Sequence, residues 1–92
     1  MKISVVVTNW NGHSLLKKNL EEIILKSPEA LEIILADDAS TDESIIFVEK
    51  LQKKYSKLKI FKHRKNGGFG RNLNDAVKKS NGDLVVILNN DI

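Results

Sequence analysis

The sequence lacks cysteine, holds a single proline and contains no long apolar run among its 92 residues. Without cysteine, disulfide frameworks and cysteine-based zinc sites are excluded. The longest apolar run, Leu84–Leu88, is far too short for a membrane-spanning helix, which needs roughly 20 apolar residues. The N-terminus leads into an apolar strand pattern without a small-residue cleavage site, so we expect no signal peptide. The length suits one hydrophobic core and not two.

Histidine and tryptophan are also scarce, which narrows the chemistry that the chain can carry. The two histidines, His13 and His63, lie in different segments, so neither a Ser–His–Asp triad nor a histidine metal cluster can be assembled. Trp10 is the only tryptophan. Its ring could stack on a nucleobase or pack over the end of a sheet.

The charge is unevenly distributed along the chain. Residues 1–46 contain 4 basic and 8 acidic residues, whereas residues 47–92 contain 11 basic and 4 acidic ones. The basic half could face nucleic acid, anionic lipid or a phosphate-bearing ligand. The simpler interpretation is a solvated surface, because lysine mostly lies at surfaces. A nucleic-acid interface is disfavoured, since no strand face interleaves aromatic with basic residues.

Strand-like and helix-like apolar patterns alternate along the chain. The pattern predicts βαβ repeats and a parallel sheet, with right-handed crossovers that bring the loops after the strands to one edge. Ser40 and Glu43 have the spacing of a capping box at the start of the second helix. The expected strands are residues 2–8, 31–36, 58–62 and 83–88, and the expected helices are 13–27, 40–55 and 69–81.

Polar residues collect in the loops that follow the strands, where ligands bind in open α/β sheets. They are Thr8–Asn11, Asp37–Asp42 and Asn89–Asp91. Because successive side chains in a strand point to opposite faces, Asp37 and Asp38 should have different roles, one toward a ligand and one toward backbone. The alternative is that both serve the N-terminus of the following helix, where carboxylates are favoured.

Two further features could bind phosphate or metal. Mg²⁺ takes one or two protein carboxylates and completes its shell with water and substrate phosphates, so Asp91 could serve a metal–diphosphate site or be an exposed loop aspartate. The glycine-rich turn Asn66–Asn72 leads into a helix. It could offer backbone N–H groups to an anion, with Arg71 as a fixed charge, or be a tight turn without a ligand.

Taken in order, five segments resemble the nucleotide-binding half of a family 2 glycosyltransferase, and the resemblance covers the whole chain. The segments are Val5–Gly12, Ala36–Asp42, Asn66–Phe69, Asn81–Asp83 and Leu88–Asp91. The resemblance implies a truncated GT-A fold, a Rossmann-like βαβαβαβ arrangement. Its four-stranded, mainly parallel sheet would have the order 3-2-1-4, flanked by three helices. It also implies inverting transfer of a hexose-type sugar from a nucleotide-diphospho-sugar to an acceptor hydroxyl.

The resemblance assigns roles to particular residues. Thr8 and Trp10 match positions that line the nucleobase pocket, and Asp38 matches the carboxylate that contacts the base, with Asp37 beside it. The full set of predicted substrate-binding residues is Thr8, Asn9, Trp10, Asp37, Asp38, Gly68, Arg71, Asn74, Asn89, Asn90 and Asp91. Of these, Gly68, Arg71 and Asn74 belong to the segment that closes over the nucleotide.

The segment Asn89–Asp91 occupies the place of the family's Asp-x-Asp motif, so Asp91 would hold the Mg²⁺ or Mn²⁺ that bridges the diphosphate. Two positions depart from the family pattern. Asn89 replaces the first aspartate and adds no charge to metal binding. Leu73 stands where many members carry an arginine, and Arg71, on the same helix face as Asn74, could substitute for it.

The sequence therefore predicts a single donor-binding domain, residues 1–92, for a UDP-, dTDP- or GDP-sugar. Family members continue past the metal motif into the acceptor-binding half and its carboxylate base, so we assign no catalytic residue and expect no sugar transfer by this chain alone. The alternatives are a stand-alone, non-catalytic nucleotide-binding module and, more remotely, a nucleic-acid-binding domain. We expect a cytoplasmic protein, with the inner face of the membrane as a peripheral location. Val85–Leu88 carries no charge, so the strand 83–88 would be an open apolar edge, and we expect a symmetric homodimer through it.

Overall fold

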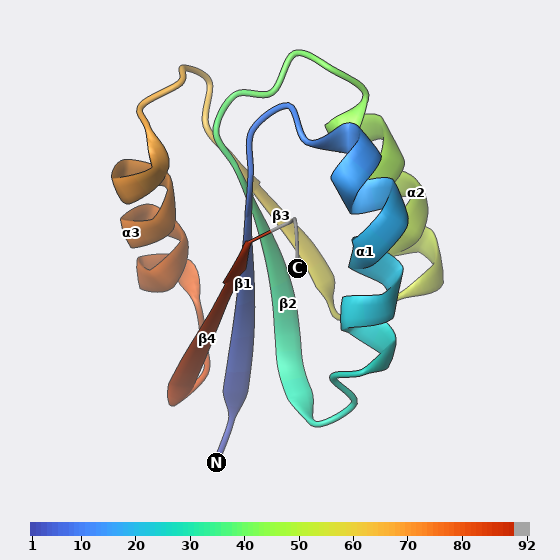
Figure 1. Ribbon diagram of the computed structural model, residues 1–92. Helices are drawn as coiled ribbons and strands as arrows, with labels where there is room; N and C mark the ends of the chain where they lie inside the picture. The colour runs from blue at the N-terminus through green and yellow to red at the C-terminus, as the bar shows by residue number, and fades with distance from the viewer. Residues whose placement is uncertain (90–92) are drawn as a thin grey trace.

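The computed structural model describes residues 1–89, and Figure 1 shows strands and helices in strict alternation along them. In chain order the elements are β1 (Ile3–Asn9), α1 (His13–Leu25), β2 (Ala30–Asp37), α2 (Ser44–Lys54), β3 (Leu58–Lys62), α3 (Phe69–Lys79) and β4 (Leu84–Asn89). The predicted α/β class, with four strands and three helices among the described residues, is confirmed.

The strands form one sheet in the order β3-β2-β1-β4, and each neighbouring pair is parallel. This confirms the predicted order 3-2-1-4. Val7 of β1 lies opposite Leu35 of β2 on one side and Leu88 of β4 on the other. The direction of the strand order changes between β1 and β4, so the loops after these two strands flank the point where ligands bind in such sheets.

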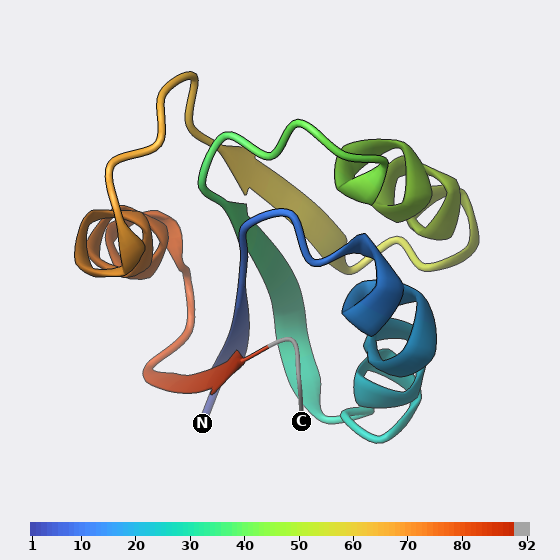
Figure 2. The ribbon, with the colours of Figure 1, turned by 45° about the horizontal axis from the view of Figure 1, so that its top comes forward.

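Helices cover both faces of the sheet: α1 and α2 lie on one face and α3 on the other (Figure 2). The pleat of β1 serves both layers, because its side chains alternate between the faces. Val5 and Val7 pack in the cluster that contains Leu16 of α1, whereas Val6 packs in the cluster that contains Ala76 of α3. The β-branched run that predicted a buried strand is thus buried on both sides.

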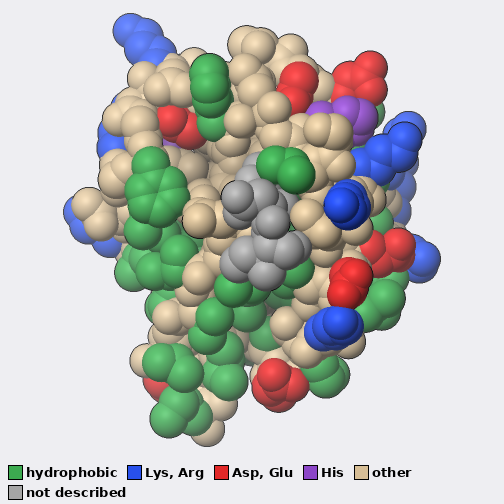
Figure 3. Space-filling view, in the orientation of Figure 1, with side chains coloured by type: hydrophobic (Ala, Val, Ile, Leu, Met, Phe, Trp, Pro, Cys, Tyr) green, Lys and Arg blue, Asp and Glu red, His purple; other side chains and the backbone are tan. Residues whose placement is uncertain are grey.

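The strand β4 is more exposed than the other strands of the sheet. Leu84, Val86 and Ile87 are 47%, 37% and 46% exposed, and Figure 3 shows hydrophobic side chains gathered at the surface over β4. Among the described residues, no helix is both long and apolar enough to cross a membrane.

The predicted capping box at the start of α2 is wrong. The helix begins at Ser44, and Glu43 makes no side-chain cap. Its first N–H, that of Ser44, instead donates to Asp42 Oδ1 at 2.9 Å, while the Ser40 hydroxyl donates to Asp37 Oδ1 at 2.6 Å. Asp42, which lies closer to the helix, caps it in place of Ser40, because the Ser40 hydroxyl is bonded to Asp37 within the loop.

The end of the sheet away from these loops holds a buried carboxylate, Glu32, which is 0% exposed. It accepts hydrogen bonds from the Ser4 hydroxyl at 2.6 Å, the Asn81 backbone N–H at 2.6 Å and the Lys59 ammonium at 3.0 Å. Burial works to raise the pKa of Glu32, but these hydrogen bonds outweigh it and lower the pKa to about 2. Glu32 therefore ties β2 to β1, to β3 and to the turn before β4.

Candidate functional site

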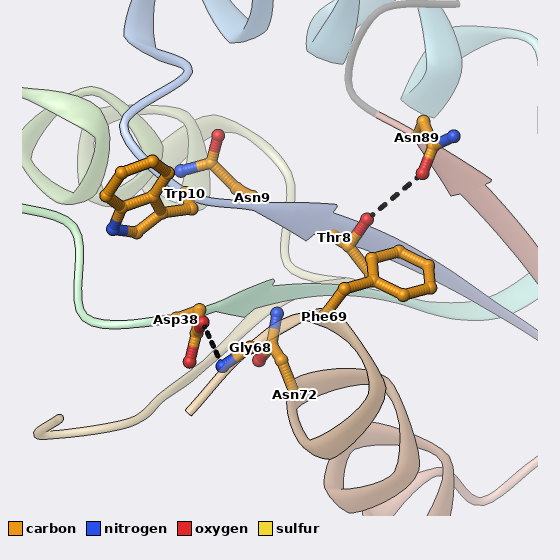
Figure 4. A pocket seen from close by; sticks show the side chains of 8 residues that line it. All are labelled: Thr8, Asn9, Trp10, Asp38, Gly68, Phe69, Asn72 and Asn89. Carbon is orange, nitrogen blue, oxygen red and sulfur yellow. Dashed lines mark hydrogen bonds between the residues drawn. The ribbon is translucent and has the colours of Figure 1, made fainter. Parts of the chain in front are cut away.

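A pocket opens at the carboxyl ends of β1, β2 and β4, beside the start of α3 (Figure 4). Its volume of about 340 Å³ is within the range of small-molecule sites. It is lined by Thr8, Asn9, Trp10, Asp38, Gly68, Phe69, Asn72 and Asn89. The pocket thus lies at the edge of the sheet where the sequence predicts a site.

The loop after β1 supplies one wall of the pocket. The Thr8 hydroxyl donates to Asn89 Oδ1 at 3.3 Å, which joins the ends of β1 and β4. Trp10 is 58% exposed, so its ring is free to meet a ligand instead of packing over the sheet end. Figure 4 shows Trp10 and Phe69 on opposite sides of the pocket. The wall therefore combines hydrogen-bonding side chains with aromatic surface.

The neighbouring carboxylates of Asp37 and Asp38 have different partners. Asp37 is 1% exposed and accepts hydrogen bonds from the Asn9 side-chain amide at 2.9 Å and from the backbone N–H of Ser40 at 2.9 Å. These bonds join the loop after β1 to the loop after β2. Asp37 does not line the pocket, so its place is that of a support behind the site.

Asp38 faces the pocket and the glycine-rich turn. Its two oxygens accept the backbone N–H groups of Gly67 at 3.0 Å and Gly68 at 2.9 Å. Gly68 has φ +91°, a conformation that favours glycine. Asp38 therefore holds the start of α3 against the end of β2, and each of its oxygens keeps a further lone pair for a ligand.

The alternative in which both aspartates serve the N-terminus of α2 does not describe the structure, because Asp42 has that place. Asp42 also accepts the backbone N–H of His13 at 3.0 Å, so one carboxylate caps the first residues of α1 and α2. Burial works to raise the pKa of Asp42, while the hydrogen bonds from Ser44 and His13 outweigh it and lower the pKa. This loop is fixed by charge-assisted hydrogen bonds on the side away from the pocket.

Arg71 and Asn74 lie on α3 but are not among the residues that line the pocket. Arg71 Nη2 is 3.6 Å from Asp38 Oδ1 and also donates to the carbonyl oxygen of Lys65. Its guanidinium thus braces the glycine-rich turn from outside the pocket. Asn74 is exposed. Their predicted contact with a nucleotide stays a prediction, and Asn90 and Asp91 lie outside the described residues.

Two residues line the pocket without having been assigned a role from the sequence, Phe69 and Asn72. Both lie in the glycine-rich segment, and Phe69 is 57% exposed whereas Asn72 is 2% exposed. A usable signal was present for Asn72, because it shares the buried face of α3 with Ala76 one turn later. An amide on an apolar helix face needs hydrogen-bond partners and so indicates a specific contact.

A second contact fixes the loop between β3 and α3. His63 Nε2 lies 2.8 Å from Asp75 Oδ2, and this hydrogen bond lowers the pKa of Asp75. With Asp38 at the other end of the loop, both sides of the glycine-rich turn are anchored. Within the described part of the chain, no three His, Cys, Asp or Glu side chains come together as a metal site.

Comparison with known proteins assigns this architecture to a family. The model of Glycosyl transferase family 2 matches residues 4–92. A poly(ribitol-phosphate) beta-glucosyltransferase of Bacillus spizizenii is 33% identical over 99% of this chain and 15% of its own length. Across the most similar curated relatives, the chain spans between 15% and 36% of their length.

Solved structures share the fold. Staphylococcus aureus TarS 1–349 in complex with UDP-GlcNAc superposes with a TM-score of 0.85 at 32% identity, over 99% of this chain and 27% of that one. A mannosyltransferase of Pyrobaculum calidifontis in complex with GDP-Man and Mn²⁺ has a TM-score of 0.87 at 24% identity, over 98% of this chain and 27% of that one. The resemblance in the sequence and the GT-A fold are thereby confirmed. The chain belongs to glycosyl transferase family 2.

Proposed function

We propose that the pocket at the carboxyl edge of the sheet binds the nucleotide part of a nucleotide-diphospho-sugar, and that residues 1–92 are the donor-binding part of a glycosyltransferase. The observation that carries this proposal is the convergence of the loops after β1, β2 and β4 and the start of α3 on one cavity. The cavity pairs an exposed Trp10 ring with the carboxylate of Asp38. Aromatic surface for stacking and an acceptor for base N–H groups are the two means by which proteins hold a nucleobase.

The proposal includes a divalent metal ion because the chain offers oxygen ligands for one. Asp91 would supply one carboxylate, and a single carboxylate suits Mg²⁺ or Mn²⁺ when water and substrate phosphates complete the shell. Asn89 at the pocket wall offers an amide oxygen and no charge. When bound, such an ion would neutralise the charge that develops on the departing nucleotide diphosphate.

We assign donor binding and no transfer to these residues. Asp37 is buried and committed to Asn9 and Ser40, and both oxygens of Asp38 accept backbone N–H groups. Neither of these two carboxylates is thus placed as a free base for an acceptor hydroxyl. For inverting transfer of a hexose-type sugar, we therefore assign the role of base to neither.

Calorimetric titration of UDP, dTDP and GDP in the presence of Mn²⁺ tests the proposal. We expect binding of at least one diphosphate, weakened by chelation of the metal and by Asp91→Ala. Asp83→Ala, an exposed aspartate at the opposite end of the sheet, is the matched control and should leave binding unchanged. Absence of binding by all three nucleotides, or equal binding by Asp91→Ala, would contradict the site.

We also infer that two copies of the 92-residue chain pair through β4. Leu84, Val86 and Ile87 are exposed there, and the strand carries no charged side chain. An edge strand without charge readily adds a second strand. Val86→Lys should shift the chain to monomer in light scattering at high concentration, and a wild-type chain that is strictly monomeric would count against the pairing.

A further inference from the structure

Among the described residues 1–89, one buried polar atom of the pocket has no hydrogen-bond partner, the side-chain oxygen of Asn72. Asn72 is 2% exposed. A buried amide oxygen that stays unpaired costs free energy, so such atoms are rare and call for an explanation. The residue lies in the pocket wall beside Gly68, with Asp38 beyond it (Figure 4).

The orientation of the Asn72 amide is fixed by its other end. Nδ2 donates to the carbonyl oxygen of Ala36 at 2.8 Å, at the last position of β2 before the two aspartates. Turning the amide over would set two oxygens against each other, so the free atom is an acceptor and not a donor. The Asn72 side chain thus positions α3 on β2, and its Oδ1 is left as an acceptor without a partner among the described residues.

Asp38 adds acceptor capacity to the same corner of the pocket. Its oxygens each accept one backbone N–H, from Gly67 and Gly68, and retain a lone pair. Among the described pocket residues, the Thr8 hydroxyl donates to Asn89 and the Asn9 amide donates to Asp37, so these two donors are engaged. Asn72 and Asp38 therefore offer hydrogen-bond acceptors to a ligand on this side of the pocket.

We propose that Asn72 is a specificity-determining residue that selects nucleobases with a ring N–H on their Watson–Crick edge, which are uracil, thymine and guanine. This inference rests on the proposed function. Cytosine and adenine carry a ring nitrogen lone pair at the corresponding position, which would face the acceptors of Asn72 and Asp38. A site built around a particular hydrogen bond rejects ligands that leave its buried groups unpaired.

Room for such a base exists next to the amide. A Cβ built on Gly68 would have nothing within 4 Å, so the pocket is open beside the turn that adjoins Asn72. The Trp10 ring can stack on the flat face of any base, so stacking adds affinity but does not discriminate between bases. The hydrogen-bond acceptors of Asn72 and Asp38 would make that discrimination.

The test compares diphosphates that differ in the base alone: UDP, dTDP, GDP, CDP and ADP, titrated with Mn²⁺. We expect the wild-type chain to bind at least one ring N–H nucleotide about tenfold or more tightly than CDP and ADP, the scale of one good hydrogen bond and its mismatch. Asn72→Leu, of similar size, should reduce this ratio severalfold. Val48→Ala, in the core under α2, controls for a general loss of stability and should keep the ratio.

The outcomes separate this inference from the proposed function. Binding of every nucleotide with similar affinity, or a ratio unchanged in Asn72→Leu, would overturn the role of Asn72 while leaving nucleotide binding intact. Binding of none would overturn both. If Asn72→Leu does not fold, the side-chain amide of Asn72 in ¹⁵N spectra of the wild-type chain decides instead. We expect its signals to shift more with UDP than with CDP, and equal shifts would contradict the inference.

Discussion

The two ends of the sheet both bury a carboxylate, but they use it differently. At the amino ends of the strands, Glu32 is fully buried and its oxygens are engaged by Ser4, Lys59 and Asn81. At the carboxyl ends, Asp38 holds a backbone turn and still faces a pocket, where the Asn72 amide oxygen has no partner within residues 1–89. A closed network stabilises the fold, whereas an open one leaves polar groups for a ligand.

Backbone strain also differs between the amino and carboxyl ends of the sheet. The described residues with positive φ are Asn11, Ala39 and Gly68, and all three lie in the loops at the carboxyl edge. Alanine in this conformation is unfavourable, so the fold must compensate for it elsewhere. The comparison suggests that the amino end carries the stability that the strained, incompletely paired carboxyl end requires.

The largest effect should come from breaking the closed network. Glu32→Ala leaves the Ser4 hydroxyl and the Asn81 N–H without their partner, and we expect it to lower the free energy of unfolding by about 3 kcal/mol. Glu22→Ala, which removes an exposed ion pair with Lys26, should leave the free energy of unfolding nearly unchanged. Urea denaturation compares the two variants, and equal losses would remove the distinction between the ends.

The pH dependence of stability should report the same carboxylate. The pKa of Glu32 is lowered to about 2 in the folded chain, below its value in the unfolded chain. Its contribution is therefore complete above about pH 4.5 and is lost as the pH falls toward 2, an effect of about 2–3 kcal/mol. Glu32→Gln should flatten the wild-type acid limb in denaturation curves measured between pH 6 and pH 2; a limb of unchanged slope would contradict the assignment.

Removing the support behind the pocket should cost less. Asp37→Ala frees the Asn9 amide and the Ser40 N–H, and we expect a loss of about 2 kcal/mol in the free energy of unfolding. The loops after β1 and β2 should exchange their amide protons faster, which hydrogen exchange can measure. A variant as stable as the wild type would show that Asp37 is not a structural link.

Asp38→Asn should separate binding from stability. The amide keeps one acceptor oxygen for the glycine turn but sets its NH2 group against the second backbone N–H, so stability should fall by about 1–2 kcal/mol. Affinity for UDP or GDP should fall about tenfold or more, since a charge-assisted hydrogen bond to the base is lost. Calorimetry and denaturation on the same sample measure both quantities, and a loss of stability without a loss of affinity would reverse the assignment.

The smallest effect concerns strain at the carboxyl edge. Ala39 has φ +61°, and Ala39→Gly relieves this conformation while adding freedom to the unfolded chain. We expect a gain in stability of at most about 1 kcal/mol, seen as a higher thermal midpoint. A clear decrease would mean that the alanine methyl group contributes packing that outweighs its strain.

The fold was predictable because it depends on local patterns. Apolar runs with strand and helix periods define the order of elements, and strand–helix units of about thirty residues favour parallel pairing. The capping box at Ser40 failed because the Ser40 hydroxyl donates to Asp37 within the loop and its oxygen accepts from Asn9 and Asn11 of the neighbouring loop. Glu32 lies within an apolar strand pattern, and its partners Ser4 and Asn81 come from distant parts of the chain, so no local signal predicts the network.

The candidate site was predictable in part. Thr8, Trp10 and Asp38 lie in the pocket, as the polar loops indicate. Asp37 does not, because the pleat turns it behind the loop. Phe69 and Asn72 were missed. Asn72 carried a signal, an amide one turn before Ala76 on the same helix face, whereas the direction of Phe69 depends on how α3 docks on β2, which the sequence does not specify.

A titration of the ¹⁵N-labelled chain with UDP or GDP and Mn²⁺, followed residue by residue in NMR spectra, tests the central claim most directly. We expect shifts concentrated at the carboxyl edge, at the Trp10 indole N–H and the backbone of Gly67 and Gly68, while Ser4 and Gly82 at the amino end stay unchanged. Absence of shifts with both nucleotides, or shifts centred on Ser4 and Gly82, would contradict the assignment of the open end of the sheet as the binding site.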